Sequence, residues 1–332
     1  MLAVLVASIS ALMLAIGPSV PAHAAVDRAP DGSIGIRLLE IPAEAADDPR
    51  ALLYIVDHVQ PGTVIERRLL VANGTDQPTG IDLYAAAATV QDGVFQGAAG
   101  RSPNDLSTWT SVSEPHPVLA AGGEQIVTVT IAVPSDAAPG EQYGAVWAET
   151  TSTAETGVTA VNRVGIRLYL SVGPGGAPAA DFTVDSLAAT RSTAGEPTVL
   201  AEVRNTGGRA LDMFGELTLT GGPGGLSAGP FPAVLGTTVG IGDDETVTIV
   251  LDEQIPAGPW NAQLTLHSGL LERSVSAAIT FPDAGSAAPV EISSGPTLSD
   301  VMLISAIVVL LAVLVALIFR RRRNRAVVVA QA

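Results

Sequence analysis

Two segments of the chain share one pattern, and that pattern decides the fold. Gly122–Glu149 reads GGEQIVTVTIAVPSDAAPGEQYGAVWAE, and Gly242–Leu266 reads GDDETVTIVLDEQIPAGPWNAQLTL. In both, an acidic residue precedes Val or Ile alternating with Thr. A Pro follows, and a turn of Ala, Pro and Gly leads to an aromatic residue and a second apolar run. Alternation with a period of two is typical of a half-buried β-strand.

A second pair of similar segments lies upstream of the first. Thr63–Tyr84 reads TVIERRLLVANGTDQPTGIDLY, and Thr198–Leu219 reads TVLAEVRNTGGRALDMFGELTL. Each predicts a strand, a polar turn that begins with Asn, and another strand. The order of the two patterns is the same in both halves, so the sequence predicts one type of sandwich used twice. Tyr143 and Trp260 are then expected to match, each ring capping a core where a strand leaves its turn.

The rest of the chain outside its two ends supports an all-β fold. Period-two alternation also appears at residues 34–38, 81–83, 164–172, 199–203, 247–251, 262–266 and 275–281. We therefore predict two tandem immunoglobulin-like β-sandwich domains and one C-terminal transmembrane helix.

Stretches rich in Pro, Gly and Ala place the domain boundaries. The first sandwich is predicted over residues 26–172, a linker over 173–180 and the second sandwich over 181–282. A juxtamembrane linker is predicted over 283–300.

The first residues have the features of an exported protein. An apolar run is followed by PAHAAVD, so residues 1–24 are predicted to be a signal peptide cleaved between Ala24 and Ala25. An N-terminal membrane anchor is the alternative.

The last residues predict a membrane anchor. Val301–Phe319 carries no charged side chain and, as a helix, is about 28 Å long, close to the roughly 30 Å of a hydrocarbon core. Residues 320–332 form a basic tail that begins RRRRNR. Under the positive-inside rule this tail is cytoplasmic. The prediction is a single-pass plasma membrane protein whose two sandwiches lie outside the cell.

The charge balance argues against nucleic acid as a partner. The chain has 17 basic and 33 acidic residues, and every basic residue is Arg. Five Arg belong to the tail, so the residues before it carry a net charge of −21. Nucleic acid binding needs a basic surface. The chain has no Cys, which excludes disulfides and thiolate metal sites.

Residues 90–109 form the longest polar insertion of the first block and are the predicted ligand-binding loop. Asp92, Asn104 and Asp105 lie in it, and Trp109 ends it. The Trp109 ring could stack on a sugar, or it could turn inward and plug the end of the sandwich. The three oxygen-bearing side chains could bind a calcium ion. Such residues in a loop are more often simply solvated.

Motifs for catalysis, cofactors and metals are missing from the sequence. His58, His116 and His267 lie on separate segments without a partner at metal-binding spacing. No nucleophile elbow, HExxH pair or phosphate-binding loop occurs. We predict no enzyme activity, no cofactor and no metal.

Residues 59–95, 118–149 and 161–173 together resemble the peptidoglycan-binding domain of WxL-interacting proteins. The motifs that carry the resemblance are VQPGTVIERRLLVANGTDQPTG, VTVTIAVPSDAAPGEQYGAVWAE and VNRVGIRLYLSVG. The order of signal peptide, two sandwiches, span and basic tail is also similar. The resemblance implies that the first domain binds peptidoglycan and the second contacts a WxL-type or other surface protein. No Trp-x-Leu motif occurs here, so the chain would be the partner of a WxL protein.

Two hypotheses follow from these observations. In the first, the protein is a membrane-anchored scaffold at the cell surface that grips the cell wall and presents its second domain to a protein. In the second, it is an accessory subunit of a secretion, pilus or adhesion system that binds a partner protein by strand pairing.

Overall fold

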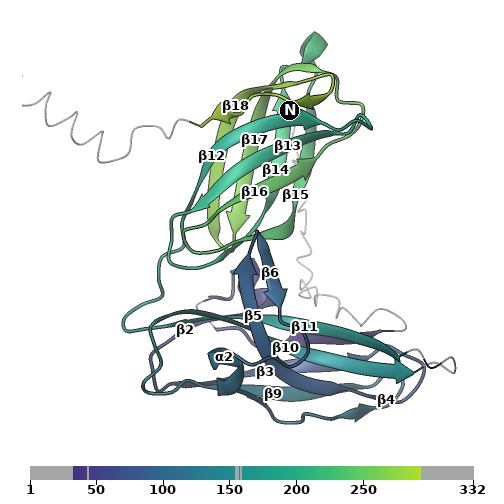
Figure 1. Cartoon of the computed structure of the whole chain (residues 1–332), viewed down its shortest axis with the longest axis vertical. Coiled ribbons are helices and arrows are strands. Elements are labelled where there is room, and N and C mark those ends of the chain that lie inside the picture. The colour runs from purple at the N-terminus through teal and green to yellow at the C-terminus, as the bar shows by residue number, and fades with distance from the viewer. Residues whose placement is uncertain (1–32, 43–44, 154–156, 158, 293–332) are drawn as a thin grey trace, which may run out of the picture.

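The structure is a computed structural model, and it describes residues 33–42, 45–153, 157 and 159–292. Two β-sandwiches follow one another along the chain, as the sequence predicts. Figure 1 shows the first sandwich in blue to teal and the second in green. The β5–β6 hairpin projects from the first sandwich towards the second.

The first sandwich packs a four-stranded sheet on a five-stranded sheet. The strand orders are β1-β3-β9-β7 and β2-β11-β10-β5-β6. β2 runs parallel to β11, whereas the other neighbours in these sheets are antiparallel. The strands of the first sheet are β1 (Ile34–Leu38), β3 (Val64–Asn73), β9 (Glu124–Ala132) and β7 (Thr110–Val112). Those of the second are β2 (Ile55–Val59), β11 (Thr159–Val172), β10 (Gly140–Thr153), β5 (Asp82–Gln91) and β6 (Val94–Gly97).

The second sandwich is built in the same way, with strand orders β16-β13-β12-β19 and β15-β14-β17-β18. β20 also pairs with β12. The first sheet contains β16 (Asp244–Val250), β13 (Pro197–Asn205), β12 (Phe182–Arg191), β19 (Gly285–Ser286) and β20 (Val290–Glu291). The second contains β15 (Ala228–Val239), β14 (Leu211–Thr220), β17 (Gly258–Ser268) and β18 (Leu271–Phe281). Each sandwich encloses its own apolar core.

The repeated Asn turn has the same geometry in both domains. Asn73 is 1% exposed and Asn205 is 2% exposed. The Asn73 Nδ2 donates to the carbonyls of Gln77 at 2.8 Å and Leu119 at 3.1 Å. The Asn205 Nδ2 likewise donates to the carbonyls of Arg209 at 2.8 Å and Val239 at 3.1 Å. Buried polar groups need such partners, so the Asn fixes the turn in each sandwich.

The expected match between Tyr143 and Trp260 is wrong. Gly140 and Gly258 open the equivalent strands β10 and β17, with φ of 142° and 127°. Trp260 is the second residue after its Gly, whereas Tyr143 is the third after its own. Because successive side chains of a strand point to opposite faces, Trp260 enters a core and Tyr143 faces outward.

Two short helices occur where the sequence pattern indicates none. α1 (Pro49–Leu53) precedes β2, and α2 (Asp105–Trp109) lies in the predicted polar loop. That loop also holds the strand β6. A 3₁₀ turn, η2 (Pro223–Gly225), and the short pair β4 (Thr79–Gly80) and β8 (Val118–Leu119) complete the described elements.

The ends of the chain lie outside the described residues. The predicted signal peptide, the span Val301–Phe319 and the basic tail all fall there. No helix among the described residues is both long enough and apolar enough to cross a membrane. Within the predicted juxtamembrane linker, β19 and β20 pair with β12.

Candidate functional site

The four predicted ligand-binding residues do not share one site. Asn104 caps α2: its Oδ1 accepts from the Ser107 backbone N at 2.9 Å, and its Nδ2 donates to the Tyr143 carbonyl at 2.7 Å. Asp105 begins that helix and is exposed. Trp109 ends it, half-buried against the core of the first sandwich. Asp92 lies elsewhere, at the turn between β5 and β6, with a φ of 50°.

The turn that contains Asp92 touches the second domain. The Thr238 backbone N of β15 donates to the Gly93 carbonyl at 2.7 Å. Burial raises the pKa of Glu245 at the start of β16; a hydrogen bond from the Gly93 backbone opposes the rise, and the Asp243 and Asp92 carboxylates add to it. Asp92 therefore lies at the contact between the domains.

An aromatic cluster forms the centre of that contact. The Tyr169 ring is 1% exposed, with centroids 5.0 Å from Phe95, 5.8 Å from Tyr54 and 5.9 Å from Tyr143. Ala210 of the second domain is buried in the same cluster. Burial raises the pKa of the Tyr169 and Tyr143 hydroxyls well above the usual range. Both hydroxyls therefore act as neutral donors at ordinary pH.

Asp212, at the start of β14, accepts hydrogen bonds from three side chains of the first domain. Its Oδ1 accepts from the Tyr169 hydroxyl at 2.8 Å and from Arg167 Nη1 at 3.0 Å. Its Oδ2 accepts from Arg50 Nε at 2.6 Å. Thr238 of its own domain donates to Oδ1 at 2.8 Å. A carboxylate that is 2% exposed is stable only with partners of this kind, so Asp212 joins the domains.

Glu141 of β10 makes a second polar contact between the domains. One of its oxygens accepts from the Ala210 backbone N at 2.6 Å and from the Tyr143 hydroxyl at 2.7 Å. Burial raises the pKa of Glu141, while these hydrogen bonds oppose the rise. This interface between the domains was not predicted from the sequence. Its only signal was polar and aromatic side chains on the outward positions of strands 140–153 and 159–172.

β11 presents a free strand edge at the other end of the first domain. It pairs with β10 along its whole length, but β2 covers its other side only from Leu168 to Val172. From Ala160 to Arg167 the described residues provide no strand on that side. Residues 159–163 are all exposed, and the Val161 side chain is 56% exposed. The end of the β10–β11 hairpin is thus a two-stranded ribbon that extends beyond its core.

Several other edge strands of the described chain carry features that discourage pairing. β15 contains Pro230 and Pro232 and has two register shifts against β14. β7 and β6 are short, and β19 and β20 cover β12. β18 begins with the exposed charges of Glu272 and Arg273 and packs beside β12. Proline, bulges, short length and charge are common protection for sheet edges, and of these the open part of β11 has only the charges of Arg163 and Arg167.

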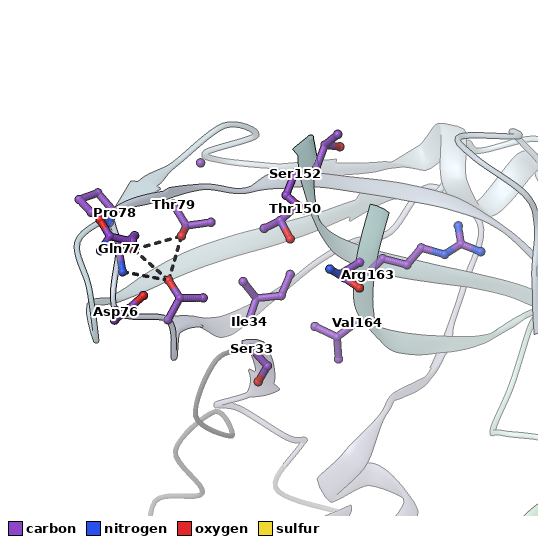
Figure 2. A pocket seen from close by; sticks show the side chains of 14 residues that line it. Ser33, Ile34, Asp76, Gln77, Pro78, Thr79, Thr150, Ser152, Arg163 and Val164 are labelled. Carbon is purple, nitrogen blue, oxygen red and sulfur yellow. Dashed lines mark hydrogen bonds between the residues drawn. The ribbon is translucent and has the colours of Figure 1, made fainter. Parts of the chain in front are cut away.

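A cleft of about 710 Å³ lies beside this ribbon (Figure 2). It is bounded by the start of β1, the Asn turn and the ribbon. Most of its side chains carry hydroxyls or amides: Ser33, Thr75, Gln77, Thr79, Thr150, Thr151, Ser152 and Asn162. The turn side is held by hydrogen bonds, including Thr75 Oγ1 to the Asn73 Oδ1 at 2.7 Å. Arg163 reaches away from the turn in Figure 2, and its guanidinium lies 4.3 Å from the Trp147 ring centroid.

Among the residues that the structure describes, no group of three or more His, Asp or Glu side chains could hold a metal ion. The three His side chains in those ranges bond elsewhere. The His58 Nε2 contacts the Gly175 carbonyl at 3.3 Å, and the His116 Nδ1 contacts Asp82 at 2.8 Å. His267 stacks on Phe214.

Comparisons with known proteins give similar folds and no family. No protein family model matches the chain, and no curated protein sequence matches it. The CfaA chaperone of class 5 fimbriae is 10% identical, with a TM-score of 0.35 over 74% of this chain and 99% of that one. The CupB2 chaperone of Pseudomonas aeruginosa is 11% identical, with a TM-score of 0.36 over 68% of this chain and 97% of that one.

A chain of the Salmonella enterica SafA pilin complex with the SafB chaperone is also similar. It is 12% identical, with a TM-score of 0.37 over 78% of this chain and 95% of that one. Identities and TM-scores this low establish neither a shared family nor a shared function. The function has to be argued from the residues described above.

Proposed function

We propose that this protein is a non-enzymatic binding protein at the outer face of the plasma membrane that pairs a strand of a partner protein with β11. The observation that carries the proposal is the edge of β11 from Ala160 to Arg167, on which the described residues place no strand opposite β10. A strand edge offers a row of backbone donors and acceptors, and a partner strand added there gains main-chain hydrogen bonds. This is the role of an accessory subunit in a secretion, pilus or adhesion system. The apolar segment Val301–Phe319 is the proposed anchor.

A proline scan of the full chain in its own cells tests this function. Alternate residues of β11 direct their N–H towards β10 and away from it. Proline at Ala160, Val161, Asn162 and Arg163 in turn should therefore affect partner capture with a period of two. Proline at a position whose N–H points away from β10 should abolish partner capture and leave the fold intact.

Partner capture is measured by photo-crosslinking from a benzophenone amino acid placed at Thr159. The same group at Thr280, which is exposed on β18, is the matched control. One discrete protein adduct from Thr159 and none from Thr280 is the expected result. Equal adducts from both positions, or a proline scan without alternation, would show that β11 does not pair with a partner.

Peptidoglycan binding in the cleft of Figure 2 is the second candidate function. The observation that favours it is the lining of hydroxyl and amide side chains, which suit the hydroxyls and amides of a glycan. The full chain should then be retained by purified sacculi. Ser152→Trp, which fills the cleft, should release it, and the proline variants that lose partner capture should not. Retention that Ser152→Trp leaves unchanged would place any wall contact elsewhere.

A further inference from the structure

Trp147 of β10 lies on the outer face of its sheet, where two glycines make room for its ring. Its neighbours along the strand point into the core, so the Trp147 side chain points away from it. The residue directly across on β11 is Gly165. A Cβ at Gly165 would lie 2.6 Å from the Trp147 Cε3, and a Cβ at Gly97, the last residue of β6, would also clash with the ring. The indole therefore spans from Gly165 to Gly97 and fills the space that two side chains would occupy.

The hydrocarbon edge of this indole points towards the open edge of β11. Cε3 and Cζ3 are the ring atoms nearest to Gly165, whereas Cζ2 and Cε2, on the nitrogen side of the indole, are near Gly97. Gly165 belongs to the stretch from Ala160 to Arg167 that has no strand opposite β10. A strand added there would place one outward side chain next to Gly165. That side chain would meet the C–H groups of Trp147, because Gly165 has no side chain to separate them.

Arg163 of β11 covers one face of the same ring. Its guanidinium carbon lies 4.3 Å from the Trp147 ring centroid, and its two terminal nitrogens donate to the Ala98 carbonyl at 3.2 and 3.3 Å. Arg163 is exposed, and it shares the outer face of β11 with Gly165, two residues away. A side chain added next to Gly165 would therefore lie beside the Arg163 guanidinium as well as the Trp147 edge.

The charges around Gly165 balance one another. Glu149 of β10 is directly across from Arg163, and opposite charges in such a pair attract. Arg167, two residues beyond Gly165, is paired with Asp212, its Nη1 lying 3.0 Å from the Asp212 Oδ1. Each arginine on this face thus has a carboxylate of this chain close to it. The position next to Gly165 therefore favours an uncharged side chain.

Among uncharged side chains, an aromatic ring fits this position best. The edge of an aromatic ring is electropositive and its face is electronegative, so the C–H edge of Trp147 attracts the face of a second ring. The Arg163 guanidinium is attracted to a ring face for the same reason. We infer that the partner strand that pairs with β11 carries an aromatic residue next to Gly165. The inference rests on the proposed pairing at β11 and names the side chain by which the partner is recognised.

Labelled octapeptides, with one residue for each position of the open edge, test the inference by fluorescence anisotropy with the purified full chain in detergent. Val and Thr alternate in every peptide, Val on the core side and Thr outward, and one outward position is varied. Only Ile166 and Arg167 follow Gly165 on the open edge. The varied position is therefore third from the C-terminus for a parallel strand and third from the N-terminus for an antiparallel one, and both sets are made.

The varied residue is Phe, cyclohexylalanine, Leu, Ala or Glu. Cyclohexylalanine is the matched control, because it has nearly the size and apolar surface of Phe but no aromatic face. In one of the two sets, the Phe peptide should bind about tenfold more tightly than the cyclohexylalanine peptide, the combined effect of an edge-to-face contact and a cation–π contact. The Glu peptide should bind no more tightly than the Ala peptide.

Substitutions on the protein locate the contact. Arg163→Gln and Trp147→Leu should each lower the preference for Phe over cyclohexylalanine by about threefold or more, and they should leave the affinity for the Ala peptide unchanged. Arg101→Gln is the matched control. The Arg101 guanidinium covers the Tyr84 ring at 4.3 Å, but Tyr84 lies on β5, on the side of β10 away from the open edge. Its loss should leave the preference for Phe unchanged.

Equal binding of the Phe and cyclohexylalanine peptides, or tightest binding of the Glu peptide, would overturn the inference and leave the pairing edge in place. A preference for Phe that survives both Arg163→Gln and Trp147→Leu would also overturn it. Failure of the proposed function is distinguishable. In that case no octapeptide binds at millimolar concentration, or binding is unchanged by proline at the positions of β11 whose N–H points away from β10, and the inference falls with it.

Discussion

The two sandwiches use the same turn and the same order of their central strands, yet they direct their aromatic side chains to opposite faces. Trp260 plugs the core of the second domain, with its Nε1 donating to the Pro256 carbonyl at 3.2 Å. Tyr143, one residue further from the equivalent Gly, turns outward and packs in the interface. A single residue of offset thus converts a core position into a contact between domains, because the side-chain period of a strand is two.

Replacing Trp260 by Ala should have the largest effect on stability. The ring is 2% exposed, so its loss opens a cavity that costs about 3–5 kcal/mol of unfolding free energy. Tyr143→Ala should cost less, about 1–3 kcal/mol, because Tyr143 is only partly buried. Urea unfolding of both variants measures the two losses. Equal losses would mean that the two rings contribute equally to the free energy of unfolding, although they point to opposite faces of their sheets.

Asp212→Ala should break the interface and leave each core intact. It strands Arg50 as a buried, unpaired cation, which costs about 3–5 kcal/mol. Hydrogen exchange should become faster in α1 and β14 while β3 and β13 stay protected. Asp181→Ala is the control, since the Asp181–Arg273 pair is exposed and its loss should cost less than about 1 kcal/mol. Faster exchange throughout both cores would show that the interface and the cores unfold as one unit.

Asn73→Ala and Asn205→Ala test whether the shared turn is equivalent in energy as well as in geometry. Each removes a side-chain amide that satisfies buried carbonyls, so each should cost about 1–3 kcal/mol. Thermal unfolding of the two variants measures the difference, with Asn261→Ala as the control because the Asn261 side chain is exposed on β17. A loss of stability in only one variant would mean that the two turns share their geometry but not their contribution to stability.

Glu141→Gln should have the smallest effect and should appear mainly in the pH dependence. The folded state raises the pKa of Glu141, so it binds a proton that the unfolded state releases. Stability from this group is therefore present below its ordinary pKa and is lost as the pH rises through the folded value. Gln keeps an acceptor for Ala210 and Tyr143 and removes that loss. The urea midpoint should fall less steeply between pH 4 and 8 for the variant than for the parent. If the two proteins show the same dependence on pH, the pKa of Glu141 is not raised in the folded state.

The fold could be predicted further than the site because strand alternation is a local signal. The alternation in Val127–Val133 and Val247–Leu251 indicates which face of each strand is buried. Asn73 and Asn205 mark the turns that follow their strands. β5 (Asp82–Gln91) also extends the predicted strand at residues 81–83, although both Leu83 and Tyr84 are buried in it. These features depend on neighbours in the sequence.

The interface could not be predicted because its members are distant in the chain. Arg50, Arg167 and Asp212 are each unremarkable in sequence, and only the packing of the two domains brings them together. The hairpin around Asp92 looked like a binding loop because Gly, Asn and Asp mark turns whatever the turn contacts. Whether Trp109, Asn104 or Asp105 contacts a ligand stays a prediction.

The ribbon at the end of β10 and β11 also has a mechanical consequence. β11 runs from the proposed pairing edge directly into the segment that leads to β12, so tension applied at the ribbon travels along the strand. The hydrogen bonds between β11 and a paired partner strand would lie across that direction and be loaded together in shear. A protein pulled between a partner on one side and its proposed anchor on the other would then resist through this pairing and would not unzip from its tip.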